Sequence, residues 1–256
     1  MCELFGLSSK KEYRINESLR EFFANYKNHP HGWGMYWQNN DETHLIRDTK
    51  PAGLSPKRDQ IMSEDIIATT ALAHIRHATI GQIELSNCHP FQKIDRSGRI
   101  WTLIHNGTIF DYDPLSLYYY KQTGETDSER VILYLTDQIG IAEKDGAVSD
   151  EQRFRLLDDL VTKLADKNKL NLLFTDGTFL YAHTNYPGSL HAWQVDDETV
   201  LFSTRALETG TWKELPLNTL TAYRSGVKVF TGQTHDHTYV DNQRDLDMIY
   251  QTYSGL

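Results

Sequence analysis

A cysteine follows the initiator methionine directly, in the opening residues MCELFG. Its thiol is either incidental or a nucleophile that becomes the first residue of the chain once Met1 is removed. A small second residue such as Cys2 permits this removal, which would leave the cysteine with a free α-amine. The reference pKa of an α-amine is about 7.7–8.0, so a useful fraction is neutral near pH 7 and can accept the thiol proton. Cys2 would then supply both the nucleophile and its base.

Four further stretches combine residue types that bind or transform small molecules. They are His31-Gly32-Trp33-Gly34, His74–Thr79 (HIRHAT), His105–Thr108 (HNGT) and Glu125–Glu129 (ETDSE). Each also has an ordinary structural interpretation. Asn-Gly is common in turns, and an acidic residue such as Asp127 is favourable at a helix start. No single stretch decides the function.

The histidines of these stretches raise the question of a metal site. No pair has the helical i, i+4 spacing of a zinc protease, and His89 and His105 stand alone beside their own loops. We therefore expect no metal ion and no other cofactor. A metalloenzyme built on the histidines stays as an alternative, which elemental analysis would test.

In this order and spacing, the stretches resemble the class II glutamine amidotransferases, whose domain has the N-terminal-nucleophile (Ntn) hydrolase fold. The resemblance runs from MCELFG through GWG, HIRHATIG, NCHPF, HNGTI and ETDSE to LLFTDG and LFSTRAL, which is nearly the whole chain. Its specificity lies in the joint occurrence of these motifs. The chain is most similar to the small single-domain members, including those that hydrolyse γ-glutamyl compounds, and not to the long synthases with a second catalytic domain.

The resemblance implies a role for the principal motif residues. Cys2 would attack the side-chain amide of glutamine and release ammonia, leaving a γ-glutamyl thioester that water hydrolyses. The Asn106 side chain and the Gly107 backbone N–H would stabilise the oxyanion, and the loss of one such donor typically costs roughly 10²–10³ in rate. Arg76 would bind the α-carboxylate of glutamine, a task that suits a planar guanidinium. Asp127 would bind its α-ammonium.

Other residues of the motifs receive weaker assignments. His77 and Thr79 belong to the segment that forms the glutamine loop in the family and would shape the substrate pocket. His31 stands where small relatives commonly have aspartate, so the resemblance gives it no role. His89 and His105 are expected to be hydrogen-bonded histidines near the site rather than acid–base catalysts.

The residue pattern also predicts the elements that hold these motifs. Apolar alternation and turn signals predict strands, and apolar stripes with capping signals predict helices. The predicted strands are 2–9, 31–39 with 43–48 as a hairpin around Asn39–Glu42, 70–79, 99–109, 170–184 as a hairpin around Asp176-Gly177, 191–204 and 212–226. The predicted helices are 15–28, one that starts at Thr126 with Glu129 in a capping-box pattern, and one that starts at Ser149 with Gln152 in the same pattern.

Strands, then two helices, then strands again predict an α+β fold. We expect a four-layer αββα sandwich of two antiparallel sheets, formed as a single domain by residues 1–256. The sequence shows no repeat, no low-complexity stretch and no convincing linker. Residues 232–256 are too few to form a second catalytic domain.

Composition excludes several classes of partner. The 256 residues are 39% hydrophobic and 24% charged, as in ordinary globular proteins, and the net charge is −9 without a cluster of Lys and Arg. This argues against nucleic acid and against membrane surfaces as partners. The first twenty residues are too polar for a secretory signal, so we expect a cytoplasmic protein. The only two cysteines, Cys2 and Cys88, are expected to be free thiols, with Cys88 structural.

Two uses of the same chemistry stay open. A glutamine amidotransferase of this size would pass its ammonia to a separate partner synthase subunit, whereas a stand-alone enzyme would hydrolyse γ-glutamyl peptides or conjugates. Arg76 and Asp127 do not discriminate, because both substrates present the same free α-carboxylate and α-ammonium. We favour the amidotransferase with a partner. A catalytically silent binding protein is disfavoured, because such a protein need not keep Cys2, Arg76, Asn106 and Asp127 together.

Overall fold

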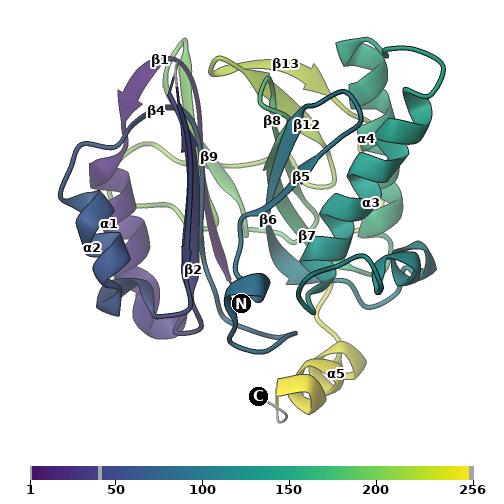
Figure 1. Ribbon diagram of the computed structural model, residues 1–256, viewed down its shortest axis with the longest axis horizontal. Coiled ribbons are helices and arrows are strands. Elements are labelled where there is room, and N and C mark those ends of the chain that lie inside the picture. The colour runs from purple at the N-terminus through teal and green to yellow at the C-terminus, as the bar shows by residue number, and fades with distance from the viewer. Residues whose placement is uncertain (1, 40–41, 254–256) are drawn as a thin grey trace.

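Two antiparallel sheets face each other, and helices cover the outer face of each sheet (Figure 1). The computed structural model describes residues 2–39 and 42–253. In spatial order, the first sheet contains β11 (Lys213–Glu214), β9 (His191–Asp196), β10 (Thr199–Ser203), β1 (Glu3–Arg14), β4 (Ile67–Ile75), β2 (Trp33–Gln38) and β3 (Thr43–Asp48). The second contains β13 (Val227–Thr231), β12 (Thr221–Arg224), β8 (Leu180–Thr184), β7 (Lys169–Thr175), β6 (Ile100–Thr108) and β5 (Phe91–Ile94). The predicted αββα sandwich is confirmed.

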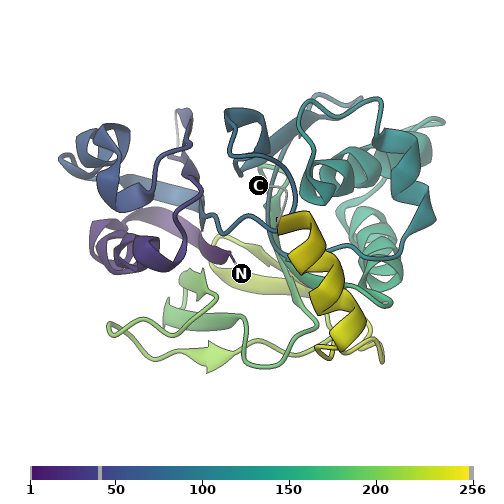
Figure 2. The same cartoon turned by 90° about the horizontal axis from the view of Figure 1, so that it is seen from below.

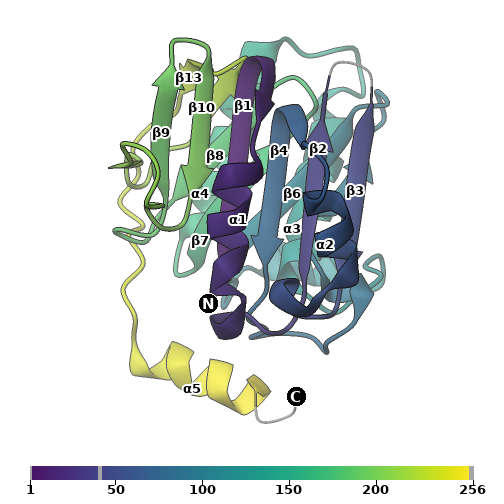
Figure 3. The same cartoon turned by 90° about the vertical axis from the view of Figure 1, so that its left-hand side faces the viewer.

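The helices form the two outer layers, with one exception. Helices α1 (Asn16–Ala24) and α2 (Pro56–Met62) cover the first sheet, and α3 (Asp127–Ala142) and α4 (Asp150–Ala165) cover the second. Helix α5 (Gln243–Tyr253) stands apart from these layers, at the end of the molecule where β1 begins (Figure 3). No helix in the described part of the chain combines the length and apolar character needed to cross a membrane.

The central strands of both sheets are buried on both faces, because each sheet is covered on both sides. Successive strand residues point to opposite faces. In β1, Leu4 therefore enters the core between the sheets, while Phe5 packs beneath α1 with its ring 5.8 Å from that of Phe22. In β6, Leu103 faces α3 and Ile104 faces the first sheet. Three apolar cores thus hold four layers together.

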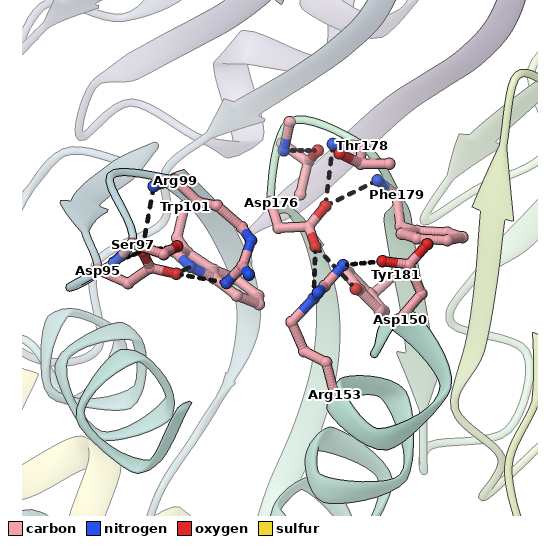
Figure 4. A network of polar contacts seen from close by, with 12 residues as sticks. Asp95, Ser97, Arg99, Trp101, Asp150, Arg153, Asp176, Thr178, Phe179 and Tyr181 are labelled. Carbon is pink, nitrogen blue, oxygen red and sulfur yellow. Dashed lines mark hydrogen bonds and ion pairs between the residues drawn. The ribbon is translucent and has the colours of Figure 1, made fainter. Parts of the chain in front are cut away.

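A buried ion pair fastens α4 to the hairpin of β7 and β8 (Figure 4). Arg153 Nε donates to Asp176 Oδ2 at 3.0 Å, and both side chains are almost completely buried. The other carboxylate oxygen of Asp176 accepts hydrogen bonds from the backbone N–H groups of Thr178 and Phe179. The Asp176 carboxylate therefore fixes both the turn between β7 and β8 and the helix that packs on it. This turn is the one that the sequence predicts at Asp176-Gly177.

The sequence also predicts a hairpin around Asn39–Glu42 and two helix starts with capping residues. The pair β2–β3 is confirmed, although residues 40–41 of its turn lie outside the described residues. The predicted strand 191–204 is instead two paired strands, β9 and β10. The capping box at Ser149 and Gln152 is confirmed. At Thr126 half of the box forms, because the Glu129 carboxylate accepts from the N–H groups of the preceding turn instead of from Thr126.

Some elements differ from the prediction. Helix α1 ends at Ala24, and the last predicted turn, 25–28, is a 3-10 helix. The sequence pattern does not predict α2, α5, β5 or β13. Helix α2 is short, with Pro56 at its first position and Ser55 accepting from the Arg58 N–H as its N-cap, so it has little room for an apolar stripe.

Strand register brings the motifs to one end of the sandwich. In the first sheet, Glu3 of β1 and Trp33 of β2 both lie opposite Ile75 of β4. The residue before β1, the residues after β4 and the residues before β2 are therefore neighbours. Strand β6 of the facing sheet carries Asn106 and Gly107 near its C-terminal end.

Candidate active site

The Cys2 side chain lies against the backbone of the segment that follows β4. Its Sγ is 3.4 Å from both the backbone oxygen and the backbone nitrogen of His77, so the thiol donates to the carbonyl and accepts from the N–H. Burial raises the pKa of the Cys2 thiol, and the nearby positive charge of Arg76 acts in the opposite direction. Because the net effect keeps the sulfur protonated at neutral pH, nucleophilic attack by Cys2 requires a base.

A cavity of about 460 Å³ opens over Cys2. Its volume lies within the roughly 300–1,000 Å³ typical of small-molecule sites. Its wall includes the predicted site residues Cys2, His77, Thr79, Asn106 and Gly107. Arg76 and Asp127 do not line it and are 3% and 4% exposed. The structure thus brings five predicted residues to one cavity and buries the other two.

Asn106 and Gly107 belong to the part of the wall that comes from the second sheet. Asn106 is buried, and its Oδ1 has no hydrogen-bond partner among the described residues. Asn106 also lines the cavity, and its side-chain amide carries N–H donors. A Cβ at position 107 would lie 1.9 Å from the backbone oxygen of Lys169, so the close approach of β7 requires glycine there.

The Arg76 guanidinium donates to three backbone carbonyl groups of the loop that follows it. Nη1 donates to Gln82 at 3.0 Å, and Nη2 donates to Ile80 at 2.9 Å and to Gly81 at 2.8 Å. Glu125 holds the same loop from the other side, since its carboxylate accepts from the Gln82 N–H. Arg76 therefore orders residues 77–82 in this structure, and a substrate carboxylate would have to replace some of these carbonyl groups.

The Asp127 carboxylate begins α3 and accepts from two backbone N–H groups, those of Ile109 at 2.7 Å and Ser128 at 2.8 Å. The Ser128 hydroxyl lies 3.0 Å from His105 Nδ1, and the other ring nitrogen of His105 lies 3.3 Å from the Lys169 carbonyl oxygen. Burial lowers the pKa of His105, so its ring is neutral. Ser128 and His105 thus link Asp127 to the strand that carries Asn106.

Comparison with known proteins decides the family. The family model described as "Glutamine amidotransferases class-II" matches residues 1–195, which include all the predicted site residues. The chain belongs to this family. The resemblance stated from the motifs is confirmed.

Individual relatives agree with this membership. An uncharacterised protein of Methanocaldococcus jannaschii is 31% identical over 188 residues, which are 73% of this chain and 52% of that protein. YafJ of Escherichia coli, provisionally named a glutamine amidotransferase, is 29% identical over 186 residues, which are 72% of each chain. The chain therefore spans about half the length of the archaeal relative.

Solved structures show the same fold at low sequence identity. A predicted glutamine amidotransferase from Pseudomonas aeruginosa matches with a TM-score of 0.63 and 21% identity, covering 90% of this chain and all of that one. The glutamine phosphoribosylpyrophosphate amidotransferase of Bacillus subtilis matches with a TM-score of 0.66 and 13% identity, covering 91% of this chain and 49% of that one. These likenesses establish the Ntn hydrolase fold.

The departure from the family pattern at His31 has a structural explanation. The His31 Nδ1 accepts from the Ala78 N–H at 2.9 Å, and the His31 N–H donates to the Arg76 carbonyl oxygen. Burial lowers the pKa of His31, so the ring is neutral and can accept. His31 therefore fixes the segment that contacts Cys2. The aspartate that is common at this position in small relatives has a carboxylate, which can also accept a hydrogen bond from this N–H.

The expectation that His89 is a hydrogen-bonded histidine is wrong for the described residues. Neither of its ring nitrogens has a hydrogen-bond partner among the described residues, because the ring packs between aromatic rings. The ring centroid of His74 is 4.0 Å away and that of Phe91 is 4.6 Å away. Burial lowers the pKa of both histidines well below the usual value, which keeps them neutral.

Cys88 differs from Cys2 in accessibility. It is completely buried, its Sγ donates to the Glu84 carbonyl oxygen at 3.4 Å, and burial raises its pKa to about 11. These features are typical of a structural thiol. Over residues 2–39 and 42–253, no group of three or more His, Cys, Asp or Glu side chains could hold a metal ion.

The rest of the cavity wall comes from residues that sequence reasoning missed. They are Ala78, Thr108, Phe110, Lys169, Tyr239, Asp241, Leu246 and Ile249. The first two adjoin predicted residues and could have been found from them. The last four belong to the C-terminal segment that includes α5, and no signal in the sequence places this segment over Cys2.

Proposed function

We propose that this protein hydrolyses the γ-amide of glutamine through a Cys2 thioester. The observation that carries the proposal is the position of Cys2 in the wall of a cavity that Asn106 and Gly107 also line. Family membership supports the reaction class. The assay that tests it is the release of glutamate and ammonia from glutamine by the purified protein.

The first step needs a base, because burial raises the pKa of the Cys2 thiol. After removal of Met1, the α-amine of Cys2 takes the thiol proton, directly or through water. The sulfur bonds to the amide carbon of the substrate, and the carbonyl electron pair moves onto oxygen. When the pair returns, the C–N bond breaks and the nitrogen takes the proton from the α-ammonium and leaves as ammonia. Water then hydrolyses the thioester to glutamate and restores the thiol.

Two hydrogen-bond donors from β6 are proposed to stabilise the oxyanion that this attack forms. The Asn106 amide offers N–H donors on the cavity wall, and Gly107 offers a backbone N–H. Such preorganised donors act on charge that develops in the transition state. The His77 N–H, 3.4 Å from Sγ, favours the thiolate in the same step.

The Asn106→Ala variant should lower kcat for glutamine roughly 10²–10³-fold with a much smaller change in KM, because the lost donor acts on the oxyanion. Steady-state glutamate release measures both constants. A thermal unfolding curve that matches the wild type would show that the loss is not due to unfolding. An unchanged kcat would contradict the assignment.

Arg76 and Asp127 are proposed to hold the two charged ends of the glutamyl group. Arg76→Lys and Asp127→Asn should each lower kcat/KM for glutamine about 10–100-fold, the range that the loss of a hydrogen bond between charged groups gives. Binding and loop ordering by Arg76 can be separated with 4-aminobutanamide, which lacks the α-carboxylate. If Arg76 binds the carboxylate, Arg76→Lys should affect glutamine much more than this analogue. Equal effects on both compounds would make Arg76 a loop-ordering residue instead.

A second candidate function is hydrolysis of larger γ-glutamyl amides without a partner. The observation that favours it is the extent of the cavity wall, which includes Leu246 and Ile249 of α5 as well as Cys2 and Asn106. The partner synthase that would receive ammonia stays a prediction. Partner-free cleavage of a γ-glutamyl amide with kcat/KM above that for glutamine would favour the second function.

A further inference from the structure

The cavity over Cys2 has an apolar outer part. Its wall there is formed by Phe110, Tyr239, Leu246 and Ile249. Three of these residues lie in the C-terminal segment, beyond residues 1–195 that match the family model. Most of this outer part, all but Phe110, therefore lies outside the residues that the family model matches.

The segment that leads to α5 is anchored by a buried lysine. Lys169 is 5% exposed, and its Nζ lies 3.4 Å from Asp241 Oδ1 and 3.3 Å from the ring centroid of Tyr186. The Tyr186 hydroxyl donates to the other carboxylate oxygen of Asp241 at 2.6 Å. The charges of Lys169 and Asp241 thus compensate each other, which leaves no net charge from this pair in the cavity wall.

Two further contacts set the start of α5. The Asp245 N–H donates to Asn242 Oδ1 at 3.0 Å, and the Tyr239 hydroxyl donates to the Asp245 carboxylate at 3.1 Å. Helix α5 then crosses the end of the molecule where β1 begins (Figure 2). Leu246 and Ile249 are three residues apart, so they share one helical face, and both line the cavity.

The side chain of Leu246 is poorly covered by protein. Leu246 is 36% exposed although it faces the cavity, and α5 is not packed into either of the helical layers. An apolar side chain on a cavity wall gains stability when an apolar ligand removes it from water. Leu246 and its apolar neighbours therefore provide a surface that a ligand can cover.

The geometry points to a second subsite, formed by Phe110, Tyr239, Leu246 and Ile249, that binds an apolar amine leaving group of a γ-glutamyl amide. This inference rests on the proposed function, because Cys2 must cleave the bond between the two subsites. The anchors proposed for the glutamyl group, Arg76 and Asp127, are charged, whereas the wall formed by Phe110, Tyr239, Leu246 and Ile249 offers apolar contacts beside a compensated ion pair. A leaving amine with an aromatic or aliphatic substituent matches this wall better than one with a carboxylate.

Three substrates, tested on the full-length protein, distinguish a preference for an apolar leaving amine from a preference for one that carries a carboxylate. They are γ-glutamylbenzylamide, γ-glutamylmethylamide and γ-glutamylglycine. The first two both release an alkylamine and differ in apolar surface, and the third releases an amine that carries a carboxylate. For the wild type, kcat/KM for the benzylamide should exceed that for the methylamide about tenfold or more, the discrimination that a few apolar contacts give.

The matched variants are Leu246→Asp and Met248→Asp. They make the same change in charge on α5, but Met248 does not line the cavity and is 39% exposed. Leu246→Asp should reduce the benzylamide-to-methylamide ratio about tenfold, and Met248→Asp should keep it. Because both rates are measured on one preparation, the ratio does not depend on the folded fraction. Ile249→Asp should repeat the effect of Leu246→Asp.

Several results would overturn the subsite. These are equal kcat/KM for benzylamide and methylamide in the wild type, the same ratio in the Leu246 and Met248 variants, or better cleavage of γ-glutamylglycine than of the benzylamide. If any of them occurs while Cys2-dependent glutamine hydrolysis persists, the proposed function stands and the subsite fails. If no γ-glutamyl compound is hydrolysed, the proposed function fails and the subsite fails with it.

Discussion

The Cys2→Ala variant should lose glutamate release from glutamine by roughly 10⁴-fold or more, the scale of loss when a covalent nucleophile is removed. The Sγ of Cys2 is the sulfur that lines the cavity, and no thioester can form without it. The assay is glutamate production over a long incubation, so that a small residual rate can be measured. Labelling by an electrophilic glutamine analogue should disappear together with the activity.

Cys88→Ala is the matched control for this loss. Cys88 is completely buried, with a pKa raised to about 11, and it does not line the cavity. This variant should retain most of the activity, with at most a reduced unfolding temperature, because the packing and the hydrogen bond of a buried thiol are lost. Loss of activity in Cys88→Ala and its retention in Cys2→Ala would move the active site away from the N-terminus.

Insertion of one alanine between Met1 and Cys2 should abolish turnover to a similar extent. The insertion keeps the thiol but converts its α-amine into an amide, which cannot accept the thiol proton. Because burial already raises the pKa of Cys2, the thiolate fraction without this base is small at neutral pH. Glutamate release measures the effect.

Two controls make this insertion informative. Thermal unfolding should resemble that of the wild type, since β1 begins at Glu3, after the insertion point. Raising the pH should partly restore the rate of the inserted variant, because hydroxide can then generate the thiolate without the amine. Full activity of the inserted variant at neutral pH would refute the role of the α-amine as base.

The site motifs could be read from the sequence because each lies at the end of a strongly patterned element. Cys2 precedes β1, Arg76 follows β4, Asn106 is near the end of β6, and Asp127 begins α3. Apolar runs and a capping residue predict these elements locally. The register Glu3 opposite Ile75 then brings two of the motifs together, as the fold requires.

Other parts of the site depend on contacts between distant segments and have no local signal. The three carbonyl groups that bind Arg76 depend on the conformation of residues 80–82. Lys169 reaches the cavity because β7 pairs with β6 across about sixty residues of chain. Helix α5 packs over a cavity rather than on a sheet, and an apolar helix face does not show in the sequence which surface it will cover.

Intact-mass analysis after reaction with an electrophilic glutamine analogue tests the central claim most directly. The purified active protein should have the mass of the chain without Met1, and the reaction should add one label, which peptide mapping should place on Cys2. Loss of activity should follow the fraction of labelled chains. A fully active chain that retains Met1, or a label on Cys88 that accounts for the inactivation, would contradict an N-terminal cysteine nucleophile.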